Sequence, residues 1–224
     1  MMRMLWHKAW IETRFRTLLP TFMILFMLFQ LHVKGLLQIT NVRLMASLPV
    51  FWLIAPLVLA GCGIYTEAPF RAVKGIEGSM YFTLALPVSR RLLLGMRAAF
   101  GMLETGVFIA VVCGMAALAF PEVRASVSLT DGLKYWAAVL VCSTAIYGLS
   151  TLFSTFLDQQ WQVLATVATT FAVRMLTGDD GFAAMGSSSP VMTHAMPWTA
   201  MGISAAFGLV CLAAAVKVVE ARQY

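Results

Sequence analysis

Residues 67–97 read EAPFRAVKGIEGSMYFTLALPVSRRLLLGMR and separate two long apolar runs of the chain. The segment carries five of the 16 Lys and Arg residues, which are Arg71, Lys74, Arg90, Arg91 and Arg97. Loops rich in Lys and Arg stay on the cytoplasmic side of a membrane. We therefore expect residues 67–97 to form a cytoplasmic loop folded back onto a membrane domain, where a soluble partner can bind.

The chain as a whole is too apolar for a soluble protein. Of its 224 residues, 60% are hydrophobic and 12% are charged, whereas globular domains are about 45–50% apolar and about 25% charged. The composition therefore predicts a membrane protein. Its net charge of +6 indicates basic loops facing anionic lipid, and we expect no nucleic-acid partner.

Six apolar runs approach the length of about 20 residues that crosses a bilayer. They predict an all-α membrane protein with six transmembrane helices, at residues 18–37, 46–66, 98–120, 133–157, 161–176 and 197–216. With the N-terminus inside, four Lys and Arg before the first span, five in the loop and two after the last span make 11 inside, against five outside. This bias places both termini of a single multi-pass domain (1–224) in the cytoplasm, with the domain in the inner (plasma) membrane.

The N-terminal residues 1–17 have the pattern of an amphipathic helix. Trp6 and Trp10 share one face at helical spacing, while Arg14 and other charged residues lie largely opposite. Such a helix lies in the membrane interface. The alternative is a simple basic flank of the first span.

The basic loop has internal structure of its own. Residues 79–86 (SMYFTLAL) are too short and too mixed to span the membrane, and Pro87 ends them. Ser89 is expected to cap a helix that begins at Arg90 and Arg91 and continues into the third span. The aromatic pair Tyr81 and Phe82 would either fill a pocket on a partner or dip into the lipid interface, and the residues alone do not separate these alternatives.

Glu104 is the acidic residue within the third predicted span, which we expect to place it near the cytoplasmic end. A carboxylate in lipid is costly, so it is a functional candidate by default. It would form a structural or gating pair with a basic residue, or contact a transported substrate directly.

Two connections between the later spans are also notable. Residues 158–160 predict a tight inner turn, and residues 177–196 (TGDDGFAAMGSSSPVMTHAM) form a Gly/Ser-rich outer segment. The latter is either a re-entrant segment or an ordinary surface loop.

Chemical motifs are few. The four cysteines lie in separate apolar runs and the three histidines have no ligand spacing, so neither a metal site nor a disulfide framework is predicted. No G-x-x-x-x-G-K-[ST] motif occurs, so the chain cannot hold ATP by that device, and we do not expect it to be an enzyme.

The loop motif resembles that of a known family. Glu77-Gly78-Ser79, then Leu86-Pro87-Val88-Ser89-Arg90-Arg91, then Gly95 and Arg97, are similar to the loop between spans two and three in permeases of type-2 ABC exporters, which move polysaccharides, drugs and peptides. Six spans and an interfacial N-terminus also resemble that class. The family often has Gly-Lys where this chain has Gly95-Met96-Arg97.

The resemblance implies a permease subunit whose energy comes from a separate ATPase. Two ATPase copies would bind ATP and Mg²⁺, and a second permease copy would complete the path for a lipophilic, amphipathic or peptide-like cargo. Residues 79–86 would form the coupling helix and 177–196 the outer cap of the path. The residues that would contact the ATPase are Glu77, Gly78, Ser79, Met80, Tyr81, Phe82, Leu86, Pro87, Arg90 and Arg91, with a second contact at Asp158 and Gln159.

Two other classes of function stay open on the sequence. A membrane-embedded enzyme would use Glu104 and a histidine, and a scaffold or sensor subunit would transport nothing.

Overall fold

The described residues of the computed structural model are 21–22, 89–119, 124–125, 127–157, 159–177 and 190–221. Within these ranges every regular element is a helix and there is no β-strand. The helices are α6 (Arg90–Ala119), α8 (Leu129–Phe153), α9 (Gln159–Thr177), α10 (Pro190–Thr193) and α11 (Trp198–Ala221).

Three of these helices are long and apolar enough to cross a membrane, over Leu94–Met115, Leu129–Phe153 and Trp198–Ala221. Helix α9 contains a shorter apolar stretch, Trp161–Val173. The expectation of an all-α membrane protein is therefore confirmed at this coarse level for the described part of the chain.

Several sequence predictions lie outside the described residues. They are the interfacial helix at 1–17, the coupling helix at 79–86 and the spans at 18–37 and 46–66, of which only Thr21 and Phe22 are described, as helical. The total of six spans thus stays a prediction.

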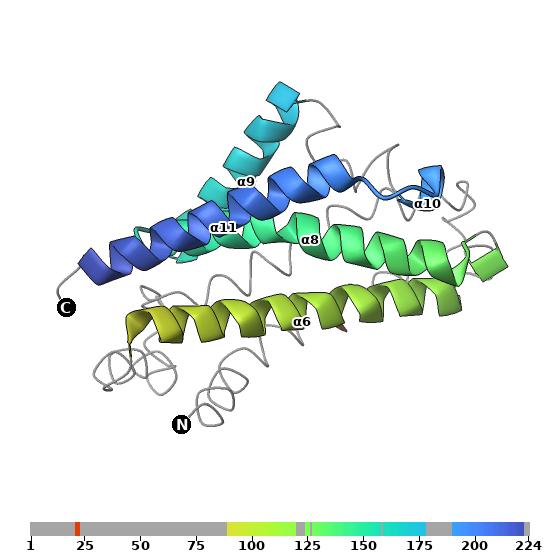
Figure 1. Ribbon diagram of the computed structural model, residues 1–224, viewed down its shortest axis with the longest axis horizontal. Coiled ribbons are helices and arrows are strands. Elements are labelled where there is room, and N and C mark those ends of the chain that lie inside the picture. The colour runs from red at the N-terminus through yellow and green to blue at the C-terminus, as the bar shows by residue number, and fades with distance from the viewer. Residues whose placement is uncertain are drawn as a thin grey trace.

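Helices α6, α8 and α11 run side by side along the long axis of the molecule, with α8 between the other two (Figure 1). The start of α6 lies beside the end of α11, as the ion pair between Arg91 and Glu220 shows. Helix α8 begins at the opposite end, close to α10, where Asp131 pairs with His194. We refer to these as the Arg91 end and the Asp131 end of the bundle. Helix α9 packs on α8 and slants away from the other helices (Figure 1).

Serine side chains begin two of the long helices. Ser89 Oγ accepts a hydrogen bond from the backbone N–H of Leu92 at 3.3 Å, which confirms the predicted start of α6. Ser128 Oγ likewise accepts from the N–H of Asp131 at 3.1 Å. Each contact satisfies one of the amide groups that a helix N-terminus leaves without an intrahelical partner. The second cap starts α8 at Leu129, four residues before the predicted span at 133–157.

The turn after α8 comes earlier in the chain than predicted. Helix α8 ends at Phe153 and α9 begins at Gln159, so the turn covers 154–157 rather than 158–160. Hydroxyl groups account for the early end. Ser154 Oγ donates to the carbonyl of Thr151 at 2.6 Å, and Thr155 Oγ1 donates to that of Leu152 at 2.7 Å. Each hydroxyl thus bonds to a carbonyl in the last turn of α8.

The tightest helix contact joins α8 to α11 through glycines. A Cβ atom placed on Gly148 would lie 2.9 Å from the Cα atom of Gly208, and one on Gly208 would lie 2.6 Å from the carbonyl carbon of Thr144. Only hydrogen fits at both positions. Small residues let transmembrane helices approach until their backbones touch, and packing at that distance is the main force that holds such helices together.

Two aromatic side chains of α8 donate hydrogen bonds to backbone carbonyls of α6. Trp136 Nε1 donates to the carbonyl of Gly106 at 2.8 Å, and Tyr147 OH donates to the carbonyl of Arg97 at 3.3 Å. A Cβ atom at Gly101 would lie 2.8 Å from the Tyr147 ring, so the glycine makes room for it. These contacts fix the register of α6 against α8 over about two and a half turns.

An apolar core lies where α6, α8, α10 and α11 meet. Its buried members are Phe108, Ile109, Val112, Tyr135, Ala138, Val139, Cys142, Val191 and Met201. Large apolar side chains also cover the outer surface, including Leu118, Trp161, Ile203 and Val210 at 62–72% exposure. An apolar outer surface of this kind is suited to contact with lipid.

Candidate functional site

The end of the predicted cytoplasmic loop meets the C-terminal part of α11. Arg91 Nη2 donates to Glu220 Oε2 at 3.1 Å, and Arg91 Nε donates to Glu220 Oε1, so the guanidinium grips the carboxylate with two parallel bonds. The hydrogen bond and the charge of Glu220 raise the pKa of Arg91. The Arg91 side chain is 75% exposed, so the pair stands on the surface of the Arg91 end.

The other predicted coupling residues are only partly within the described chain. Arg90 is the first residue of α6 and Gln159 is the first residue of α9. Asp158 and the ten residues Glu77–Leu86 of the loop, with Pro87, lie outside the described residues. The turn between α8 and α9 is nevertheless at the Arg91 end, because α8 runs toward that end. Arg90 and Gln159, which are described members of the two predicted contacts, therefore lie toward the same end of the bundle.

Glu104 lies in the middle of the apolar stretch of α6, ten residues after Leu94 and eleven before Met115. This stretch begins four residues before Ala98, the first residue of the predicted span. The position of Glu104 near the cytoplasmic end of the span stays a prediction. The side chain of Glu104 is 4% exposed, so it is buried in the helix bundle.

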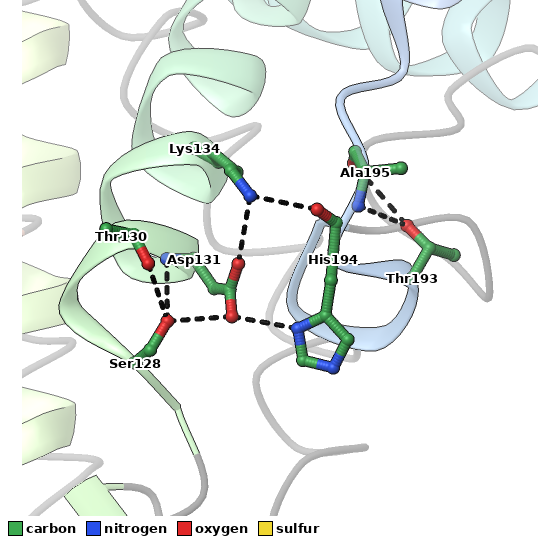
Figure 2. A network of polar contacts seen from close by, with 7 residues as sticks. All are labelled: Ser128, Thr130, Asp131, Lys134, Thr193, His194 and Ala195. Carbon is green, nitrogen blue, oxygen red and sulfur yellow. Dashed lines mark hydrogen bonds and ion pairs between the residues drawn. The ribbon is translucent and has the colours of Figure 1, made fainter.

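A polar network closes the Asp131 end (Figure 2). Ser128 Oγ donates to Asp131 Oδ2 at 2.8 Å, and the same oxygen lies 2.8 Å from His194 Nδ1. Lys134 Nζ donates to Asp131 Oδ1 at 3.3 Å and to the carbonyl of His194 at 2.9 Å. One carboxylate thus joins the start of α8 to the linker between α10 and α11.

The linker itself has an unusual backbone at the network. His194 has a φ of 57°, in the left-handed region that non-glycine residues rarely adopt. The hydrogen bond from Lys134 to its carbonyl and the contact of its ring with Asp131 hold this conformation (Figure 2). Sequence reasoning missed the network. The Ser128-x-x-Asp131 capping pattern was visible, but nothing local pointed to a histidine 63 positions away.

Helix α9 has a buried polar face and an exposed apolar one. Gln162 and Thr166 are fully buried and Thr170 is 9% exposed, at a spacing of four residues that puts them on one side of the helix. We call these three residues the polar stripe of α9. On the other side, Trp161 and Leu164 are 62% and 57% exposed. The polar residues face inward and the apolar ones face outward, the reverse of a soluble helix.

Gln162 holds α9 to α8 but leaves one amide atom open. Its Nε2 donates to Ser150 Oγ at 2.7 Å, whereas its Oε1 accepts no hydrogen bond from any residue that the structure describes. A buried polar atom without a partner costs about 1–3 kcal/mol. Thr166, one turn further along α9, donates a hydrogen bond from Oγ1 to the backbone carbonyl of Gln162 at 2.8 Å. Sequence reasoning missed this site too, although the four-residue spacing of the polar stripe was a usable signal.

Among the described residues, no group of three or more His, Cys, Asp or Glu side chains could hold a metal ion. No protein-family model, curated protein or solved structure matches this chain.

Proposed function

We propose that the chain is the membrane permease subunit of an ATP-driven ABC exporter. Two copies, or one copy and a related partner, would enclose a path across the plasma membrane for a lipophilic, amphipathic or peptide-like cargo. Two separate ATPase subunits would bind ATP and Mg²⁺, grip residues 79–86 and move the helices as they close. Both termini would lie in the cytoplasm. The proposal rests on the loop motif from Glu77 to Arg97.

The Arg91–Glu220 pair is the structural observation that best supports this proposal. The loop motif continues directly into α6, and the pair puts that point beside the end of α11. The turn between α8 and α9, the second proposed ATPase contact, lies at the same end. A soluble ATPase would need both contacts on one side of the membrane, and the shared end of Arg91 and of the turn after α8 supports that requirement.

Copurification tests the proposal. The tagged chain would be expressed with ABC ATPase subunits from the same organism, solubilised in mild detergent and captured by its tag. We expect the ATPase to copurify and to hydrolyse ATP. The Tyr81→Ala/Phe82→Ala variant should lower the amount of ATPase recovered by about tenfold, a loss of about 1.4 kcal/mol of binding energy.

A matched control separates docking from general damage. Phe207 is 46% exposed on α11, so Phe207→Ala removes an outward-facing aromatic group away from the loop. This variant should recover as much ATPase as the natural chain. Failure of any ATPase to copurify, or equal recovery from the Tyr81→Ala/Phe82→Ala variant, would contradict the docking proposal.

A further inference from the structure

The open end of the Gln162 amide is the starting observation. Gln162 is fully buried, Ser150 Oγ is its side-chain partner, and Oε1 has no donor among the described residues. The large majority of buried side-chain polar atoms in proteins have a hydrogen-bond partner, either protein or water. A fully buried amide with one open end therefore points to a missing group.

The chemistry of the amide defines that group. Nε2 donates to Ser150 Oγ, so the open atom is Oε1, which only accepts hydrogen bonds. The missing group must therefore donate a hydrogen bond. A hydroxyl group is a neutral donor of this kind.

Gln162 and Ser150 lie close to the turn that joins α8 to α9. Ser150 is three residues before the end of α8, and Gln162 is three residues after the start of α9. Both therefore lie about one helical turn from that connection. The polar stripe then continues to Thr166 and Thr170, whose hydroxyls extend the polar surface away from that connection by about 12 Å.

Helix α9 has a smaller contact with α8 than α11 has. The tight glycine contact joins α8 to α11, whereas α9 packs on α8 alone among the described helices with more than marginal contact. A side-chain hydrogen bond from Gln162 to Ser150 joins α9 to α8. Separation of α9 from α8 would therefore leave the glycine contact intact.

We propose that Gln162 and Ser150 form a binding site for a hydroxyl group, supplied by water or by a hydroxyl-bearing amphiphile. The polar stripe of α9 continues this site into the membrane. The cargo reading, in which the amphiphile is a transported molecule, rests on the proposed exporter function. The hydroxyl site itself does not.

Cysteine labelling tests whether water reaches the polar stripe. The full chain, with its four native cysteines replaced by alanine, would be placed in lipid nanodiscs without any ATPase. Thr166→Cys and Leu164→Cys would each be treated with a charged, membrane-impermeant methanethiosulfonate, which reacts with thiolates in water. We expect Thr166→Cys to react at least about tenfold faster, because Leu164 faces lipid, where the thiol stays protonated.

A matched pair of probes then distinguishes the source of the hydroxyl. 1-Decanol can donate and accept a hydrogen bond, whereas its methyl ether, 1-methoxydecane, can only accept. If an amphiphile supplies the hydroxyl, 1-decanol will slow the labelling of Thr166→Cys and the ether will not. Adding Gln162→Met, which keeps the size of the side chain but removes the amide, will abolish the slowing. If water supplies it, labelling will be fast and neither probe will slow it.

Two outcomes would overturn the inference. Labelling of Thr166→Cys at the rate of Leu164→Cys would show that no water reaches the polar stripe. Equal slowing by the alcohol and the ether would show that the site does not recognise a hydroxyl. Because no ATPase is present, either result leaves the exporter proposal to its own test. A failure of copurification likewise leaves the hydroxyl site standing.

Discussion

Asp131 illustrates how much one residue can organise. It is 7% exposed and receives contacts from Ser128, Lys134 and His194, which belong to two segments far apart in the sequence. A carboxylate that accepts several charge-assisted hydrogen bonds holds its partners more firmly than neutral groups would. The start of α8 and the linker before α11 are therefore fastened together by one side chain.

We expect Asp131→Asn to lower the melting temperature of the detergent-solubilised protein by at least about 2–4 °C, the shift that about 1 kcal/mol produces in a chain of this size. The change keeps the shape of the side chain but removes the charge that Lys134 and His194 contact. His194→Ala should have a smaller effect, because its side chain is 70% exposed and contributes one contact. The order of the two shifts, read by thermal unfolding, is the test, and a larger effect for His194→Ala would contradict it.

At the scale of helices, the contact between α8 and α11 depends on the absence of two side chains. Gly→Ala inside a helix ordinarily stabilises it by up to about 1 kcal/mol. At Gly148 and Gly208 the new methyl group would instead meet backbone atoms of the other helix, which cannot rotate away. We expect Gly208→Ala to destabilise the protein by about 1–3 kcal/mol, the usual cost of overpacking.

Gly202 is the matched control for Gly208. It lies on the same helix, and a Cβ atom there would meet nothing within 4 Å. Gly202→Ala should leave stability unchanged or raise it slightly. Chemical or thermal unfolding of both variants in the same detergent decides the matter, and similar effects at the two positions would refute the close contact.

Part of this helix arrangement was predictable from sequence. Apolar runs indicated the helices, and Ser89 correctly marked the start of α6, because capping is a local interaction. The start of α8 and the turn before α9 were misplaced by about four residues, because Ser128, Ser154 and Thr155 decide these boundaries through their hydroxyls rather than through hydropathy.

Contacts between distant residues were beyond such reasoning. Arg91 and Glu220 are 129 positions apart, and Asp131 and His194 are 63 apart. No helical or strand period links residues at these separations. The start of the third span also differs, because it was taken to begin after Arg97, whereas the apolar stretch of α6 includes that arginine. The loop motif led to the functional hypothesis. The pairing of Arg91, within that motif, with Glu220 was visible only in the structure.

At the scale of the whole molecule, the two ion pairs define opposite ends. Single-cysteine variants should therefore fall into two groups when sealed vesicles are treated with an impermeant thiol reagent. We expect Arg91→Cys and Glu220→Cys to label from the face that was cytoplasmic. Thr130→Cys and Thr193→Cys, at exposed positions of the Asp131 end, should label from the other face.

Inverted and right-side-out vesicles provide the control for this experiment, because each variant should label in only one of them. The two variants at each end of the bundle should label from the same face, because the fold puts them at the same end. Which face is cytoplasmic is predicted from the excess of Lys and Arg in the inner segments. Labelling of Arg91→Cys and Glu220→Cys from different faces would rule out the arrangement of α6 and α11.

The glycine contact also imposes a schedule on biosynthesis. Thr144 of α8 and Ser204 of α11, which touch beside the glycines, are 60 positions apart. At about 5–20 residues per second, a ribosome needs about 3–12 s to cover that distance. Throughout this interval Gly148 of α8 lacks its partner Gly208. Helix α8 therefore stays incompletely packed in the bilayer until α11 is made. The insertion of α11 is therefore the step at which α8 gains its close backbone contact.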